Sequence, residues 1–131
     1  MDLPTAEELI PKAFDHHTLI LLRWADDQPE LTEAESDRLF VEHLAYLRDR
    51  IVEGVLLVNG PLRDQTDERL RGMSIYGLPL EEALVIARRD PMVRAGWFAI
   101  EGAEWHLAKG SARFTRILDG VAVDSDAAGS S

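Results

Sequence analysis

The sequence predicts an α+β fold of the ferredoxin-like type, in which strands and helices follow the order β-α-β-β-α-β and form one four-stranded antiparallel sheet. Two segments with helical periodicity separate short apolar segments, and glycine, proline and polar residues mark the ends of each segment. The size agrees with this fold, because 131 residues, of which 46% are hydrophobic, suit one domain with a single core.

The first half of the unit is a strand followed by a long helix. The apolar run TLILL, residues 18–22, is typical of a buried strand. Thr32 and Glu35 have the spacing of a capping box, which indicates where the helix begins. Apolar residues then recur at helical spacing along one face: Phe40, Leu44, Leu47 and Ile51. Gly54 is expected to end this helix, because glycine readily adopts a left-handed backbone conformation.

The second half of the unit adds three strands and a helix. The strands are expected at residues 55–58, 70–78 and 97–107, and the helix at residues 80–89. The segment NGP, residues 59–61, is a turn signal after the first of these strands. Pro79 precedes the helix, and Asp90 with Pro91 is expected to end it.

The helices of such a fold cover only one face of the sheet. Because the expected strands carry large apolar residues on both sides, we expect the second face to pair with another copy of the chain, as a homodimer. Residues 1–17 form an N-terminal extension. Residues 108–131 form a C-terminal extension that ends in a flexible tail, and its apolar residues around Phe114 are expected to dock on the body or on the partner subunit.

The balance of charge argues against nucleic acid and membranes as partners. The chain has 14 Lys and Arg against 24 Asp and Glu, and its net charge of -10 repels phosphate backbones and anionic lipids. It contains no cysteine, which excludes disulfides and thiolate chemistry. Neither a secretory-signal pattern nor an apolar run of the roughly 20 residues that span a bilayer is present. We therefore expect a soluble, cytoplasmic protein.

Four fragments of the sequence, in this order, resemble the YciI-like (YCII-related) family: TLILLR, EHLAYLRDRIVEG, VLLVNGPLRD and ARRDPMVRAGWF. The resemblance implies a ferredoxin-like domain of the dimeric α+β barrel superfamily over residues 18–107. It also implies an active centre of one histidine and one aspartate, which by motif are His43 and Asp90. One relative is similar to a dehydrochlorinase that acts on a chlorinated hydroxyhydroquinone. Asn59 and the two terminal extensions depart from the family pattern.

The positions of His43 and Asp90 suit acid/base chemistry. His43 projects from the apolar face of its helix, where a buried imidazole needs a hydrogen-bond partner. Asp90 is the natural partner, because both helices cover the same face of the sheet. A carboxylate at the C-terminal end of a helix faces the negative end of the helix dipole. Pairing with the imidazole would compensate this unfavourable interaction of Asp90. His43 would then act as a general base, a role that needs neither a metal nor a cofactor.

Other residues are weaker candidates. His16 and His17 are adjacent on an extended segment, so their rings point in opposite directions and we expect no shared metal. His106 lacks the spacing of a metal ligand and is interpreted as a surface or dimer contact. The aromatic residues of the last strand are interpreted as core or interface anchors rather than a substrate cage: Trp97, Phe98 and Trp105.

The sequence leaves more than one function open. The first hypothesis is a small dimeric enzyme that binds a small acid, aromatic or ring-opened, and eliminates or isomerises it, with His43 as general acid/base and Asp90 as its orienter. The second is a non-catalytic dimeric module for ligand binding or interaction, in which this pair only ties two helices together. A third is an accessory domain that docks on a larger enzyme through its C-terminal segment.

Overall fold

The computed structural model describes residues 2–123 and has the predicted α+β architecture. Its elements are α1 (Ala6–Leu9), β1 (Phe14–Trp24), α2 (Glu33–Glu53), β2 (Leu56–Pro61), β3 (Leu70–Tyr76), α3 (Leu80–Arg88), α4 (Pro91–Arg94), β4 (Phe98–Ala108), β5 (Arg116–Leu118) and β6 (Val121–Val123). Four of the strands form one antiparallel sheet in the order β2-β3-β1-β4. This order is that of a ferredoxin-like fold, so the fold prediction is confirmed.

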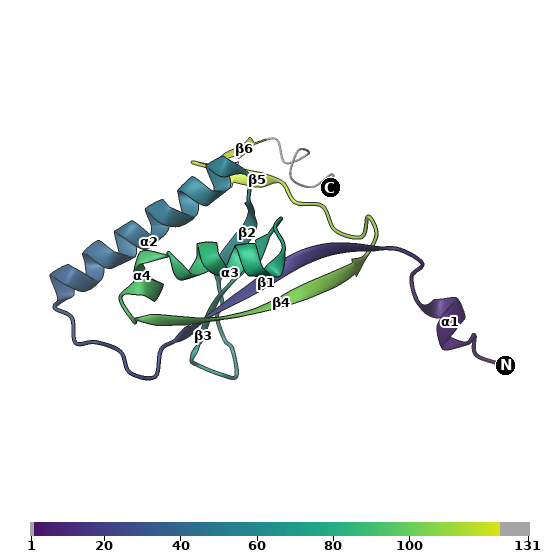
Figure 1. Ribbon diagram of the computed structural model, residues 1–131, viewed down its shortest axis with the longest axis horizontal. Helices are drawn as coiled ribbons and strands as arrows, with labels where there is room; N and C mark the ends of the chain where they lie inside the picture. Colours follow the sequence, from purple (N-terminus) through teal and green to yellow (C-terminus); the bar gives the residue numbers. More distant parts are fainter. Residues whose placement is uncertain (1, 124–131) are drawn as a thin grey trace.

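Helices α2, α3 and α4 lie on the same side of the sheet (Figure 1). The core forms where α3 meets the strands, around the buried side chains of Ile20, Leu56 and Tyr76. Ala83 and Ala87 are buried on the facing side of α3, and their small side chains let the helix approach the sheet closely. Gly102 of β4 lies under α3, where an added Cβ would come within 2.9 Å of two leucine side chains of that helix.

Strand β1 is longer than the apolar pattern predicted, whereas β4 has the expected length and is shifted by one residue. β1 begins at Phe14 rather than residue 18, and its first residues pair with the end of β4, with Phe14 opposite Ala108 and His16 opposite His106. These ends form a two-stranded ribbon that extends beyond the helices (Figure 1). Since no helix covers the ribbon, its residues need not be apolar, and a search for buried strands misses the part that belongs to β1.

Both terminal extensions contain local structure. Helix α1 has a capping box between Thr5 and Glu8 and lies at the far end of the arm formed by the N-terminal residues (Figure 1). In the C-terminal extension, the ring of Phe114 packs edge-on against His17, and Arg116 donates a hydrogen bond to the carbonyl of Ile51 at the end of α2. The expected docking on the body is therefore present. Most of the predicted flexible tail lies outside the described residues, and the domain limits of 18 and 107 remain a prediction.

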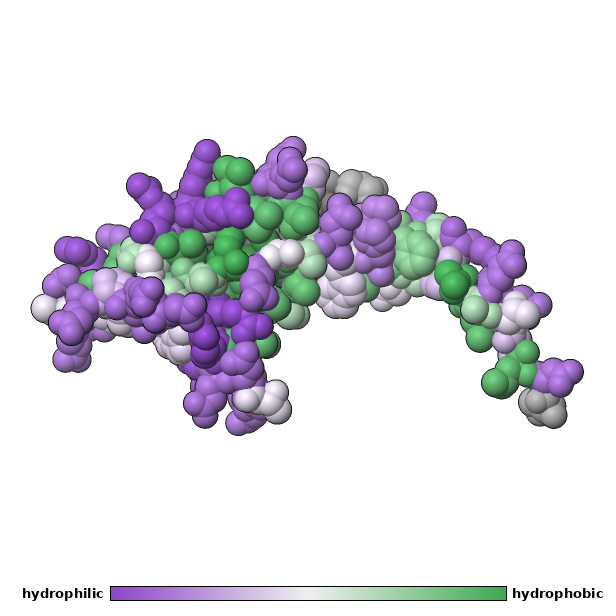
Figure 2. All heavy atoms as spheres, turned by 60° about the horizontal axis from the view of Figure 1, so that its bottom comes forward, coloured by the Kyte–Doolittle hydropathy of each residue, from purple (hydrophilic) through white to green (hydrophobic). Residues whose placement is uncertain are grey.

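The face of the sheet opposite the helices is largely apolar. Side chains alternate between the two faces, so the residues next to Ile20, Leu19 and Leu21, point away from the helices, with Ile75 and Met73 as their β3 neighbours. Figure 2 shows hydrophobic residues gathered over the middle of the molecule, and a second group on the arm that carries the N-terminus. Within residues 2–123, no helix combines the length and the apolar character that a bilayer crossing requires.

Candidate active site

A cavity of about 520 Å³ lies between α2 and the helix-covered face of the sheet. Its walls come from the N-terminal half of α2, from β2 and β3 with the turn between them, and from the region where α4 leads into β4. Most of its lining is apolar, and a few polar and charged side chains interrupt it. A concave, mostly apolar site with few polar groups is typical of small-molecule binding.

The cavity exists because only half of α2 packs on the core. Leu47 and Ile51, in the C-terminal half, pack against the buried core residues. Phe40 and Leu44 were predicted to belong to the same core stripe, but they line the cavity and are 51% and 49% exposed. The apolar periodicity was read correctly as one helical face, and it could not show that part of this face borders an open space.

His43 and Asp90 form a buried pair at this cavity. His43 Nδ1 lies 2.6 Å from Asp90 Oδ2, and the two residues are 7% and 3% exposed. An ionised carboxylate only accepts hydrogen bonds, so Nδ1 of a neutral imidazole carries the proton that it donates to Asp90. His43 itself lines the cavity. Its second nitrogen, Nε2, is then the unprotonated nitrogen of the ring.

Asp90 is held in a way that the sequence interpretation missed. It was expected to lie at the C-terminal end of the preceding helix, but it is the N-cap of α4, and its Oδ1 accepts a hydrogen bond from the backbone amide of Met92 at 2.9 Å. Its carboxylate therefore faces the favourable, positive end of a helical turn. The expected linking turn after Asp90 is this short helix. The dipeptide Asp90-Pro91 carried the signal, because aspartate at the N-cap and proline at the first position begin a helix.

Aromatic rings form one wall of the cavity. Trp24 stacks on Phe98 with 5.3 Å between ring centroids and meets Trp97 edge-on at 6.1 Å. Phe98 in turn meets the ring of His43 at 5.6 Å. Trp97 and Phe98, interpreted from the sequence as core or interface residues, both line the cavity. Trp105 does not line it and is 42% exposed.

Polar groups enter the cavity from the β2–β3 hairpin. Asn59 and Ser74 are opposite each other on the two strands, and Arg63 and Arg71 lie close to the turn. The guanidinium of Arg71 lies over the ring of Trp24, with Cζ 4.8 Å from its centroid. These residues were not identified from the sequence as binding residues, because only the fold brings them to the cavity beside His43.

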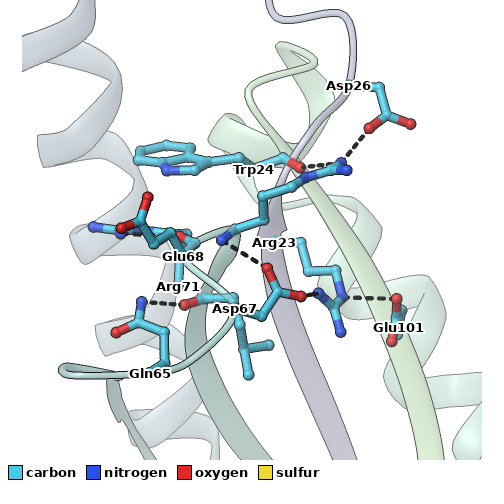
Figure 3. A network of polar contacts seen from close by, with 10 residues as sticks. Arg23, Trp24, Asp26, Gln65, Asp67, Glu68, Arg71 and Glu101 are labelled. Carbon is cyan, nitrogen blue, oxygen red and sulfur yellow. Dashed lines mark hydrogen bonds and ion pairs between the residues drawn. The ribbon is translucent and has the colours of Figure 1, made fainter.

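An ionic network fixes the base of this hairpin. Arg23 donates a hydrogen bond of 2.6 Å to Asp67 and forms an ion pair of 2.8 Å with Glu101, while Arg69 pairs with Asp26. Figure 3 shows Arg23 between the two carboxylates, and Arg71 beside Trp24. The hydrogen bond from Arg23 holds the pKa of Asp67 below its ordinary value of 3.8. The network holds the β2–β3 turn against β1 and β4.

Tyr76 lies in the core behind the pair. Burial raises the pKa of its phenol above the ordinary value of 10.0, and the nearby Tyr46 and Asp90 contribute in the same direction. The hydroxyl of Tyr46 donates a hydrogen bond to the carbonyl of Ile86 at 2.7 Å, which ties α2 to α3. Tyr76 therefore stays neutral at physiological pH and adds no charge to the core.

The remaining histidines lie away from the cavity. His16 stacks on His106 across the β1–β4 ribbon, with 4.2 Å between ring centroids, and His17 points the other way, toward Phe114. Glu104 lies 3.4 Å from Nε2 of His106. Within the described residues, no three side chains of ligand type gather in a way that could hold a metal ion.

The chain is similar in sequence to one known domain family and to a solved structure. Residues 20–102 match the model of the YCII-related domain family. No curated protein matches the chain. The solved structures that match include a 5-chloro-2-hydroxyhydroquinone dehydrochlorinase from Burkholderia phenoliruptrix AC1100, in complex with 2,5-dihydroxybenzoquinone. The two chains share 25% sequence identity over 68% of this chain and 92% of the other, with a TM-score of 0.47.

Proposed function

We propose that this chain, which belongs to the YCII-related domain family, is a small-molecule enzyme that removes a proton from a bound acid and thereby starts an elimination or isomerisation. One observation carries the proposal: the buried contact between His43 Nδ1 and Asp90 Oδ2 directly beside the cavity. His43 is the general base, and Asp90 orients its ring.

The pair has the features that general base catalysis requires. The hydrogen bond to Asp90 fixes the ring orientation and the tautomer of His43, and the negative charge of Asp90 stabilises the imidazolium that forms when Nε2 takes a proton. In an elimination, a leaving group then departs from the deprotonated ligand. In an isomerisation, the proton returns to the ligand at another atom. A positioned base of this kind contributes about 10²–10⁴-fold to the rate.

Deuterium exchange tests the proposal without knowledge of the product. The protein is incubated in D₂O with a panel of phenolic, lactone and β-keto acids, and exchange of acidic C–H positions is followed by NMR. We expect exchange in at least one acid, and we expect His43→Gln to reduce it to the uncatalysed rate. Full exchange activity in a folded His43→Gln variant would contradict the role of this residue.

The enzyme is a homodimer in this proposal, with the two sheets packed face to face. The apolar character of the second sheet face supports this arrangement, because a soluble chain rarely leaves a large apolar surface open to water. Pairing of the faces that carry Leu19 and Leu21 would bury them between two sheets. The cavity lies on the opposite side of each sheet, so dimerisation leaves it accessible.

A second candidate function follows from the burial of the same pair. The contact joins α2 to the start of α4, so it also ties two elements together as a structural link. Breaking a buried pair by removing one partner costs about 3–5 kcal/mol. A non-catalytic binding module is favoured if His43→Asn lowers the melting temperature sharply and no acid of the panel either exchanges or binds.

A further inference from the structure

We propose that Arg71 binds the anionic group of the ligand, which makes the ligand an aromatic acid whose acidic group and reacting group lie on opposite sides of one ring. This inference rests on the proposed function, because it takes His43 as the group that meets the reacting end. It adds the residue that selects the substrate and the way in which the substrate lies in the cavity.

Arg71 and His43 are the two ends of one row of side chains. The guanidinium of Arg71 lies over Trp24, Trp24 stacks on Phe98, and Phe98 contacts the ring of His43. Both end groups and both intervening rings line the same cavity. A ligand lying along this wall would have the two aromatic side chains beside its middle, a cation at one end and a base at the other.

The charge of Arg71 is available to such a ligand. Arg23 and Arg69, which lie close to it in the hairpin region, are ion-paired with Asp67 and Asp26. Arg71 pairs with no carboxylate within residues 2–123, although the whole chain has a net charge of -10. Arg63, the second arginine at the cavity, is exposed and likewise has no ion pair among the described residues. One carboxylate, that of Asp37 in the first turns of α2, lines the cavity, and it forms no ion pair with Arg71.

Arg71 is also held in place before a ligand binds. Its Nη1 donates a hydrogen bond to the carbonyl of Glu68, and the Trp24 ring supports the guanidinium plane. The guanidinium has five N–H donors, so most remain for a ligand. A carboxylate can accept two parallel hydrogen bonds from this group, which is a stronger and more directional contact than a lysine would offer. Preorganisation of this kind lowers the entropic cost of binding.

The test compares an acid with its neutral analogue. The acid is 4-hydroxyphenylacetate, which carries a carboxylate and a phenol on opposite sides of one ring, and the analogue is 4-hydroxyphenylacetamide. Binding to the full chain is measured through the fluorescence of Trp24 and Trp97, and the imidazole signals of His43 are followed by NMR. We expect the wild-type protein to bind the acid more tightly than the amide by about tenfold or more.

Three variants locate the preference. Arg71→Gln is expected to abolish the preference for the acid over the amide, because it weakens binding of the acid and leaves binding of the amide unchanged. Arg71→Lys keeps the charge but loses the two parallel N–H donors of the guanidinium, so it is expected to reduce the preference. Arg88→Gln is the matched control, because Arg88 is an exposed arginine of α3 that does not line the cavity. It should keep the full preference. Melting temperatures establish that each variant is folded.

The outcomes separate this inference from the proposed function. Equal affinity for acid and amide, or a preference that survives in Arg71→Gln, overturns the role of Arg71. If the amide then still perturbs His43, the acid/base site stands and only the anion anchor fails. If neither compound binds, the aromatic-acid class is wrong, and deuterium exchange with the other acids decides the proposed function separately.

Discussion

Asp90 reaches His43 from the first residue of a helix and not from the last, with Oδ2 2.6 Å from the imidazole Nδ1 and Oδ1 bonded to the amide of Met92. The two oxygens of one carboxylate therefore have separate tasks. One orients the histidine, and the other caps α4 and fixes the position of the carboxylate itself.

This division predicts different effects for two substitutions of Asp90. Asparagine is also a good N-cap residue, so Asp90→Asn should keep the cap through its oxygen and change stability little. Its amide nitrogen then donates to His43 Nδ1, which forces the other imidazole tautomer, and the charge that stabilises the imidazolium is lost. Asp90→Ala loses the cap, at about 1 kcal/mol, and leaves a buried imidazole without its partner, at about 1–3 kcal/mol more. Urea unfolding measures both variants. Equal stability of the two would contradict the capping role.

The end of α2 should be sensitive to a single methyl group. Gly54 is the C-cap of this helix with φ +84°, and a Cβ there would also come within 3.2 Å of the Arg116 side chain. Gly54→Ala should therefore destabilise the protein by about 1 kcal/mol. Gly60→Ala is a suitable control because a Cβ at Gly60 meets no atom within 4 Å. Comparable losses in both variants would rule out a specific effect of the left-handed conformation.

Dimer formation should depend on the apolar sheet face. Leu21→Glu places a charge on this face and is expected to shift the protein to monomers in sedimentation velocity. Val85→Glu is the control, since Val85 is an exposed apolar residue on α3, on the other side of the sheet. A wild-type monomer, or dimers that persist in a folded Leu21→Glu variant, would contradict face-to-face pairing.

The link between Arg23 and Asp67 predicts a pH dependence. Because the pKa of Asp67 is lower in the folded protein than its ordinary value of 3.8, its contribution to stability is present above that value and is lost as the pH falls through the lower, folded-state pKa. The difference in unfolding free energy between wild type and Asp67→Asn should therefore be constant near neutral pH and shrink in acid below about pH 4. A difference that grows on acidification would contradict this pairing.

Much of the fold could be predicted from the sequence because its signals are local. The capping residue Thr32, the left-handed Gly54 and the apolar run at residues 18–22 each indicate an element through their own neighbours. The start of β1, residues 14–17, could not be predicted in this way, because it pairs only with the end of β4 and leaves no apolar pattern.

The site was predictable only in part, for a related reason. His43 and Asp90 were identified by a family motif and by a histidine on an apolar face, and the structure brings them together. Arg71 and the aromatic wall depend on where β3 and β4 meet α2, which is a long-range property. The sequence also could not show that only the C-terminal half of α2 packs on the core, because Phe40 has the same helical spacing whether it faces a core or a cavity.

The most direct test of the central claim is the tautomer and ligand response of His43, measured by ¹⁵N NMR of the imidazole nitrogens and assigned with His43→Gln. At a pH where the ring is neutral, the account predicts a proton on Nδ1, donated to Asp90, and an unprotonated Nε2 whose signal moves when 4-hydroxyphenylacetate is added. A proton on Nε2, or an Nε2 signal that no acid of the panel changes, would contradict a base at the cavity and leave the pair as a structural link.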